Sequence, residues 1–478
     1  MSDGGGRSAV DALLEVASVP TISKSDEDWV AVLEDFSRAH ERCWQLVPTY
    51  GIETKALVVQ AVLKVLRPRR YDATHHNEDG EEKDGKASGK IRGRRWGKEA
   101  EAAALDAIKI LLREREQVEE LLKDSTIFAY LSAGQDPSNA LSQAGLKCLL
   151  NSLNGNEAGK KLFVTAGGLA PLLQVLAEQR PAMVHYLAVR NLYHVVATEA
   201  SGLEALAGIQ RGAKPGTISS PVALLCATLA WCVRLMDPPF PRGEGRVLLA
   251  AEILKLLFYL RSQERDDVVD EECMPFLGQV IVEALHLPHS QLSAYEVKLQ
   301  VVNLLMFLPQ DFASSLLSKG CLPVLVQILE LQILAVTIDK AEACSALTPI
   351  LAVLNNIAAS SKMAREVLKD TVFPEECDAA WRKRLEEAAE AKEAAGKVNG
   401  PSAASKQQMH PVDAPPYTLR GRLIGLMTSL EVTSKRYASE LLFNLCDSKE
   451  EFVVRTGLGN AVAMLRIKGL IGAIPNLD

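Results

Sequence analysis

The chain has 478 residues, of which 48% are hydrophobic and 24% are charged, and its formal net charge is −7. This composition is typical of a globular protein with enough apolar residues for a large core. Proteins that bind nucleic acid usually present a basic face, so the acidic balance gives no support for a nucleic-acid partner. Aromatic residues make up only 5% of the chain, which favours helices because strands are enriched in aromatic residues.

The nine cysteines are scattered along the chain, and no C-x-x-C pair occurs. This pattern predicts reduced thiols in a cytoplasmic protein, without a disulfide framework or a zinc site. The first residues contain no basic segment followed by a long apolar run, so we expect no secretory signal. We interpret the two longest apolar stretches, residues 221–236 and 321–338, as buried helices and expect no transmembrane segment.

Apolar segments with helical periodicity follow one another along the chain, and no run of alternating strand residues interrupts them. In chain order they are residues 55–66, 101–116, 141–153, 166–179, 246–263, 296–309, 319–332 and 346–360. Glycine followed by an apolar helix recurs in "TAGGLAPLLQVL" and "SKGCLPVLVQIL". Repeated helix groups of this kind predict an all-α armadillo/HEAT-repeat superhelical solenoid. We expect it to span residues 1–474, with a short tail at 475–478.

Two polar segments interrupt the helical pattern. Residues 69–98 are charged and contain glycine, and residues 383–417 are rich in Ala, Glu and Lys and then in Pro. Such compositions cannot bury enough apolar surface to order themselves. We predict a disordered insertion at 69–98 and a disordered or partly helical linker at 383–417.

An asparagine recurs within the leucine-rich part of the predicted helices. The positions are Asn151, Asn191, Asn303, Asn355, Asn356 and Asn444, and Tyr259 takes the comparable place in "EILKLLFYL". An Asn side chain offers both an acceptor and donors, so a row of them in a groove is suited to hold the backbone of a guest peptide. The alternative is that each Asn caps or bridges its own repeat.

Basic residues accompany these asparagines. Lys109 and Arg113 are four residues apart and are expected on one helix face. Arg190 precedes Asn191, and Lys362 and Arg365 follow the helix of Asn355 and Asn356. A basic set on an acidic protein is suited to receive a carboxylate or an acidic guest. The alternative is that these residues pair with nearby glutamates on the surface.

The motifs that would carry covalent chemistry are incomplete. "GEEKDGKA" (80–87) resembles a phosphate loop, but Ala87 replaces the Ser or Thr that binds magnesium, and no strand precedes it. "HHNED" (75–79) fits a polar loop better than a metal site, and "TGLGNA" (456–461) lacks the dinucleotide spacing. We therefore expect no enzyme, no cofactor and no metal.

The C-terminal stretch "LRGRLIGLMTSLEVTSKRYASELLFNLCDSKEEFVVRTGLGNAVAMLRIKGLI" (419–471) resembles the end of the armadillo core of the synembryn family. Upstream, "AIKILLRERE", "LKCLLN", "AEILKLLFYL" and "VVNLLMFLP" are similar to segments of the same family. The resemblance spans about residues 100–474. It implies a folding chaperone and non-receptor guanine nucleotide exchange factor for heterotrimeric G-protein α subunits.

The resemblance further implies that the concave groove grips the C-terminal helix of the α subunit, in its GDP-bound or nucleotide-free state. GDP then leaves, and the empty α subunit is held until GTP binds. We also expect a monomer in the cytoplasm that is recruited to the cell cortex or plasma membrane. Lys109 and Lys362 stand where relatives often have arginine, which loses bidentate recognition there. The candidate partner-binding residues are Lys109, Arg113, Asn151, Leu187, Arg190, Tyr259, Asn303, Asn356, Lys362, Arg365 and Asn444.

A generic armadillo adaptor of the import type is the alternative function. Its groove would be acidic and carry tryptophans beside the asparagines. Here Lys109, Arg113, Arg190 and Arg365 make the predicted groove basic, and the five tryptophans do not follow the asparagines. Charge therefore favours a G-protein α subunit over a basic peptide.

Overall fold

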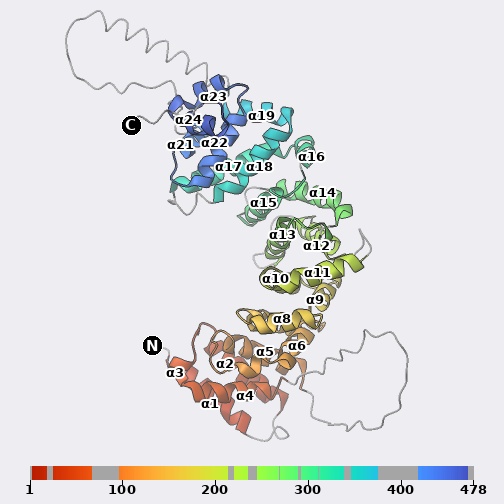
Figure 1. The fold of residues 1–478 in the computed structure, drawn as a ribbon. Helices are drawn as coiled ribbons and strands as arrows, with labels where there is room; N and C mark the ends of the chain where they lie inside the picture. The colour runs from red at the N-terminus through yellow and green to blue at the C-terminus, as the bar shows by residue number, and fades with distance from the viewer. Residues whose placement is uncertain are drawn as a thin grey trace, which may run out of the picture. The chain divides into compact units, whose positions relative to one another are not determined.

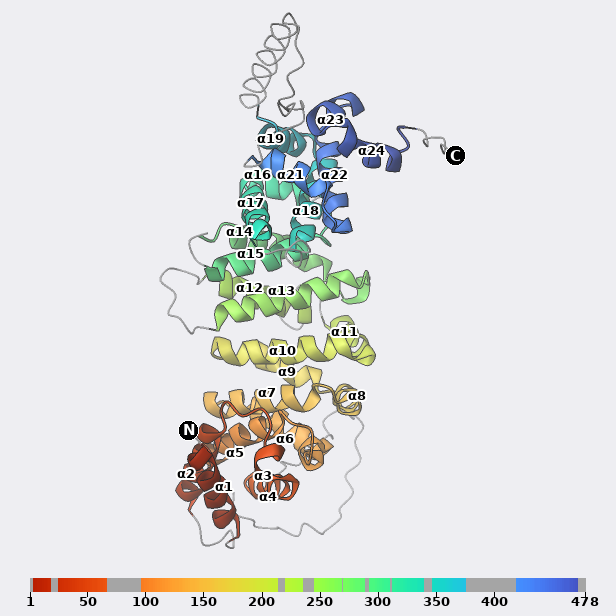
Figure 2. The ribbon, with the colours of Figure 1, turned by 90° about the vertical axis from the view of Figure 1, so that its left-hand side faces the viewer.

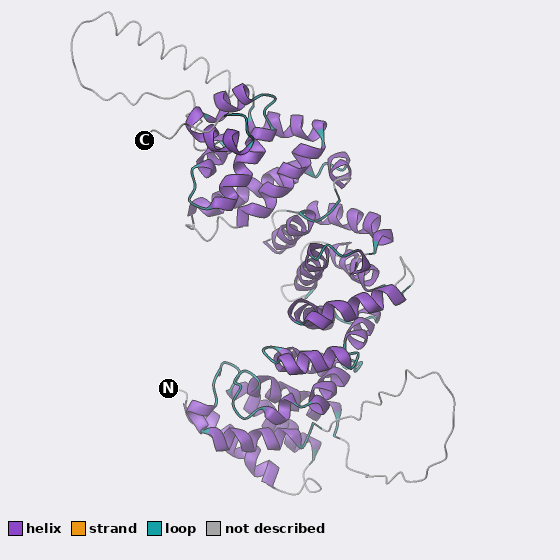
Figure 3. Ribbon diagram, in the orientation of Figure 1, coloured by secondary structure: helices purple, strands orange, loops and turns teal. Residues whose placement is uncertain are grey.

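The computed structural model describes residues 3–18, 25–66, 96–213, 220–234, 245–268, 270–288, 292–309, 312–338, 346–374 and 418–471 (Figure 1). All regular structure in these ranges is helical, and they contain no strand (Figure 3). The all-α prediction is confirmed. The chain divides into two compact units, residues 1–280 and 281–478.

The first unit contains helices that pack in successive layers. They are α1 (Asp3–Ser18), α2 (Asp26–Ala39), α3 (Val47–Tyr50), α4 (Ile52–Leu63), α5 (Lys98–Leu111), η2 (Glu119–Leu122), α6 (Asp124–Gly134), α7 (Asn139–Leu153), α8 (Glu157–Thr165), α9 (Leu169–Ala177), α10 (Ala182–Thr198), α11 (Ala200–Gly212), α12 (Pro221–Arg234), α13 (Arg246–Ser262), η3 (Asp266–Val268) and η4 (Glu271–Cys273). Helix α14 (Met274–Leu285) crosses the division between the units.

The second unit continues the helical pattern. Its helices are α15 (Leu292–Leu305), α16 (Phe312–Ser318), α17 (Leu322–Ile338), α18 (Leu347–Ser360), α19 (Lys362–Val372), α21 (Leu419–Met427), α22 (Val432–Asn444), α23 (Lys449–Thr456) and α24 (Leu458–Ile467). Within this unit, α15 packs on α18, α18 on α22, and α22 on α24.

Short polar residues set the beginnings of several helices. The Ser25 side chain accepts from the Asp28 N–H and Asp28 accepts from the Ser25 N–H, which forms a capping box at α2. Asn156, Ser361 and Ser448 cap α8, α19 and α23 in the same way, with a side-chain oxygen accepting a first-turn N–H. These caps divide the apolar sequence into separate helices.

Three-helix groups repeat in the first unit. Helices α8, α9 and α10 form one group, and α11, α12 and α13 form the next. The last helix of each group packs on the last helix of the previous group, so that α5, α7, α10 and α13 form a continuous row. We call this arrangement the helix row; Figure 2 shows α7, α10 and α13 lying nearly parallel, one above the other. Stacking of this kind is the armadillo-like solenoid that the sequence predicts.

Some predicted boundaries differ from the structure. The predicted segment 101–116 forms a helix only to Leu111, and residues 166–168 form a turn in which Gly167 has φ +78° before α9 begins. Most of the predicted insertion 69–98 lies outside the described residues, but Trp96 is buried against Trp29 and Lys98 begins α5. The predicted linker 383–417 and the tail 475–478 lie outside the described residues. One continuous solenoid through residues 1–474 remains a prediction.

Within the described ranges, no single helix is long and apolar enough to cross a membrane. Helix α16 and the part of α17 from Leu322 to Ala335 together have the length and apolar composition of a membrane span, but the chain bends by 95° between them.

Candidate partner-binding site

A cavity of about 420 Å³ opens on the helix row, between α7, α10 and α13. Most of its lining residues are polar or charged, unlike those of the apolar interior between the helices. The lining residues are Leu150, Asn151, Asn154, Arg190, Tyr193, His194, Ala197, Thr198, Glu252 and Lys255. Two of the sequence-predicted site residues, Asn151 and Arg190, therefore meet at one cavity.

Asn151 joins two helices of the row. Its Nδ2 donates to the main-chain oxygen of Lys109, with 3.3 Å between the two atoms, which ties α7 to α5. The Lys109 ammonium pairs with Asp106 at 2.8 Å, and its side chain is 27% exposed. Asn151 thus braces neighbouring repeats through its amide nitrogen, while the residue also lines the cavity.

Arg190 lies at the rim of the cavity beside a buried carboxylate. Its Nη1 donates to the Tyr186 hydroxyl at 2.7 Å and lies 3.9 Å from Glu252 Oε2. Lys255 Nζ lies 3.3 Å from the same Glu252 oxygen. Because the Glu252 side chain is only 5% exposed while those of Arg190 and Lys255 are 45% and 41% exposed, the surface charge at the rim is positive.

Tyr193 of α10 lines the cavity, and Tyr259 of α13 packs against it. The rings of Tyr193 and Tyr259 pack edge to face with 6.3 Å between their centroids. Burial, followed by the neighbouring Tyr193, raises the pKa of Tyr259, which stays neutral at physiological pH. Leu187 is buried within α10, and its main-chain oxygen accepts from Asn191. Leu187 therefore supports the row from within.

Arg113 corrects one expectation. Because α5 ends at Leu111, Arg113 lies beyond the helix and does not continue the helix face of Lys109. Its Nη1 donates to the main-chain oxygens of Glu41 and Cys43, both at 2.8 Å, and the guanidinium lies over the Trp44 ring. Arg113 holds the connection from α2 to α3 and is already occupied by the chain itself.

Asn191 is fully buried and bridges two helices of the row. Its Nδ2 donates to the main-chain oxygens of Leu146 in α7 and Leu187 in α10, at 3.0 and 2.8 Å. Its amide nitrogen therefore braces neighbouring repeats, whereas the alternative interpretation of the asparagines expects a contact within one repeat.

Replacing Asn191 with alanine is expected to lower the free energy of unfolding by about 1–3 kcal/mol, because two buried hydrogen bonds are lost and a cavity is left. Urea denaturation measures the change. The matched control is Asn356→Ala at an exposed position of α18, where we expect a change within about 0.5 kcal/mol. Equal effects of the two substitutions would contradict the bracing role.

The second unit holds the remaining predicted residues, and they do not form one cluster. Asn444 Nδ2 donates to Asn355 Oδ1 at 2.7 Å, which ties α22 to α18. Asn303 pairs with Gln300 on its own helix, α15. Asn356 is exposed and lines a small, mostly apolar cavity of about 50 Å³ between the end of α15, α16 and α18.

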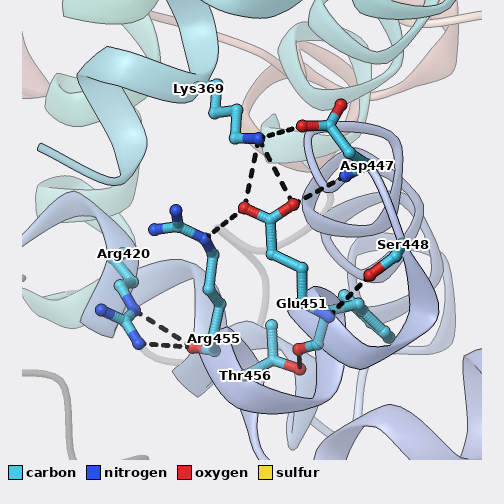
Figure 4. A network of polar contacts seen from close by, with 8 residues as sticks. Lys369, Arg420, Asp447, Ser448, Glu451, Arg455 and Thr456 are labelled. Atoms are coloured by element: carbon cyan, nitrogen blue, oxygen red, sulfur yellow. Dashed lines mark hydrogen bonds and ion pairs between the residues drawn. The ribbon is translucent and has the colours of Figure 1, made fainter. Parts of the chain in front are cut away.

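Lys362 and Arg365 lie on α19, and a polar network joins a later residue of this helix, Lys369, to α23 (Figure 4). Lys369, four residues after Arg365 on α19, pairs with Asp447 and lies 3.1 Å from Glu451 Oε1. Arg455 Nε donates to Glu451 at 2.8 Å, and Arg420 donates to the Arg455 main-chain oxygen. Burial alone would raise the pKa of Glu451, but the hydrogen bonds from the Asp447 N–H, Lys369 and Arg455 lower it. The network holds α19, α21 and α23 together.

Sequence reasoning found Asn151 and Arg190 and missed the other lining residues of the cavity, among them Tyr193, Glu252 and Lys255. The signal that was available is helical spacing. Tyr193 follows Arg190 by three residues and Lys255 follows Glu252 by three, so each pair shares a helix face. That α10 and α13 bring the two pairs together is a tertiary contact, and the sequence alone does not show it.

Comparison with known proteins supports one family. A family model described as guanine nucleotide exchange factor synembryn matches residues 104–393 and 415–476. Chaperone Ric-8A of Gallus gallus is 27% identical over 457 residues, which cover 86% of this chain and 78% of that protein. Chaperone Ric-8A of Bos taurus is 26% identical over 397 residues, which cover 77% and 68%.

Among solved structures, the crystal structure of an engineered protein has a TM-score of 0.47 and 14% identity, and covers 98% of this chain and 95% of that chain. The crystal structure of SYS-1 also has a TM-score of 0.47, with 10% identity and coverage of 92% and 63%.

Proposed function

Because the chain belongs to the synembryn family of guanine nucleotide exchange factors, we propose that it binds heterotrimeric G-protein α subunits through their C-terminal helix. In this proposal it acts as a folding chaperone and as a non-receptor exchange factor that stabilises the nucleotide-free α subunit. The observation that carries the proposal is the family match, which runs from the middle of α5 to α24.

The chemistry of the helix row supports a peptide guest. The cavity between α7, α10 and α13 combines the Asn151 amide with the exposed cations Arg190 and Lys255 and with the Tyr193 side chain. Amides and tyrosine hydroxyls suit the polar groups of a peptide, and the cations suit its carboxylates. We assign the guest helix to this face of the first unit.

Lys362 and Arg365 form a separate candidate contact, which lies on the second unit. Arg365 Nε is buried and has no hydrogen-bond partner in the described ranges, unlike Lys369 on the same helix. We propose that these two residues meet acidic groups of the α subunit.

The mechanism we propose is differential binding and makes or breaks no covalent bond. A ligand shifts a conformational equilibrium only by the difference between its affinities for the two states. The protein must therefore bind the nucleotide-free α subunit more tightly than the GTP-bound one, since equal affinities would shift nothing. GTP binding then releases the complex.

We also propose that the protein acts as a monomer in the cytoplasm and reaches the cell cortex or plasma membrane through its α subunit. Sedimentation of the purified protein tests the first point. Its distribution in cells with and without a membrane-anchored α subunit tests the second.

Replacing Arg190 with glutamine is expected to weaken binding of a labelled peptide from the C-terminus of the α subunit about tenfold, which corresponds to about 1.4 kcal/mol. The rim loses one exposed cation, while Glu252 keeps its contact with Lys255 at 3.3 Å, so the fold is preserved. Fluorescence anisotropy gives the dissociation constants.

The matched control is Arg211→Gln on α11. The Arg211 side chain is 56% exposed and pairs with Asp267, away from the cavity. Unchanged affinity is expected for this control. An Arg190 variant that binds as tightly as the wild type would remove Arg190 from the site.

A further inference from the structure

Trp44 is unusually exposed for a tryptophan. Its exposed fraction is 74%, whereas those of Trp29 and Trp96 are 1% and 4%. Tryptophan is highly buried on average because it carries a large apolar surface. Trp44 lies in the connection between α2 and α3, before the residues that the family match covers.

The backbone around Trp44 is held on both sides. On the N-terminal side, Arg113 Nη1 donates to the main-chain oxygens of Glu41 and Cys43, both at 2.8 Å. On the C-terminal side, the Glu114 carboxylate accepts from the N–H groups of Leu46 and Val47, at 3.0 and 3.1 Å. The connection is therefore fixed by two consecutive residues that follow α5.

A buried ion pair fixes Glu114 in turn. Lys55 Nζ lies 3.1 Å from Glu114 Oε2, and the exposed fractions of the two side chains are 0% and 8%. This arrangement orders the connection while most of the tryptophan ring remains in water. Ordering a binding residue in advance lowers the entropy that is lost when a partner binds.

We propose that Trp44 is an anchor for the α subunit and packs against an apolar side chain of that partner. The proposal rests on the function proposed above. Tryptophan and arginine are enriched among the residues that dominate binding energy at interfaces. Here the Arg113 guanidinium lies 5.4 Å from the centre of the Trp44 ring, so a cation–π contact helps to orient the ring.

Continuity with the helix row favours this occupant over a second copy of the chain or a lipid surface. Arg113 follows α5, and the Lys109 main-chain oxygen of α5 binds Asn151 at the cavity. Trp44 therefore belongs to the same unit and to the α5 end of the same row.

The test compares Trp44→Ala with Trp44→Phe in binding to an intact, GDP-depleted α subunit. Both variants keep the hydrogen bonds that Arg113 and Glu114 make to main-chain atoms of this connection, and circular dichroism checks the fold. We expect alanine to weaken binding about tenfold and phenylalanine to weaken it less than about threefold, since an aromatic surface remains. We also expect the bound α subunit to protect the fluorescence of Trp44 from quenching by acrylamide. The contribution of Trp44 is the fluorescence of the wild type minus that of Trp44→Phe.

Each other outcome would overturn the proposal. If Trp44→Ala binds normally while Arg190→Gln binds weakly, the anchor is wrong and the proposed function stands. If the wild type binds no α subunit, both are wrong. Loss of self-association or of vesicle binding in Trp44→Ala, with normal affinity for the α subunit, would assign Trp44 to a second copy or to a membrane.

Discussion

Replacement of Lys55 by methionine is expected to lower the free energy of unfolding of the first unit by about 3–5 kcal/mol. Methionine preserves most of the side-chain volume but removes the ammonium. Glu114 then remains buried without its cation, although it still accepts from the N–H groups of Leu46 and Val47. An uncompensated buried charge is costly, and the connection that carries Trp44 should loosen with it.

The effect of pH supplies a second signature of this ion pair. Burial alone would raise the pKa of Glu114, but the hydrogen bonds from Val47, Leu46 and Lys55 lower it below its ordinary value of 4.5. A carboxyl group with a lowered folded-state pKa stabilises the fold above its unfolded pKa, and this stability is lost as the pH falls through the folded value. As the pH falls below about 4.5, Lys55→Met should therefore lose less stability than the wild type does.

Urea denaturation at several pH values measures both effects. The matched control is Lys123→Met, which removes an exposed ion pair with Glu120, where the two side chains are 58% and 55% exposed. That change should stay below about 1 kcal/mol. A Lys55 variant as stable as this control would show that the buried pair does not hold the connection.

Lys298→Met in α15 is expected to have the opposite effect. It should raise the free energy of unfolding of the second unit. Lys298 is fully buried, and its ammonium has no hydrogen-bond partner within the described residues. Burial lowers the pKa of Lys298 from 10.5 to about 8. This difference corresponds to about 3 kcal/mol of destabilisation at neutral pH, because the folded state must bury a charge that the unfolded state keeps in water.

The sign of the pH dependence follows from the same pKa. Between pH 8 and 10.5 the unfolded state holds the lysine proton and the folded state has released it, so this group makes stability rise with pH. Thermal unfolding gives the stability of the wild type and of Lys298→Met at each pH. The difference between the two stabilities isolates the effect of Lys298 from that of other groups that titrate in this range. We expect the variant to be more stable at pH 7 and the difference to shrink toward pH 10.5. A constant difference, or a less stable variant, would contradict the assignment.

The sequence predicted the helical class because apolar periodicity and capping residues are local signals. It could not place Arg113, whose main-chain partners lie about 70 positions earlier in the chain and are reached only after α2 packs on α5. Four-residue spacing suggested one face for Lys109 and Arg113, but the end of α5 at Leu111 separates them.

The asparagines show a similar limit. Their recurrence reflects structure, since Asn151, Asn191 and Asn444 each donate to a neighbouring helix of the stack. A sequence pattern does not tell whether an amide faces a guest or the next repeat, because both uses favour the same residue type. The cavity includes Arg190, Glu252 and Lys255, which only the packing of α10 on α13 brings together.

The most direct test of the proposed function is the rate of GDP release from a purified α subunit, with and without this protein. The control is the same α subunit lacking its C-terminal residues. We predict faster GDP release from the intact α subunit, a stable nucleotide-free complex that GTP dissociates, and no acceleration for the truncated α subunit. Unchanged GDP release, with no complex formed by the intact α subunit, would contradict the proposed function.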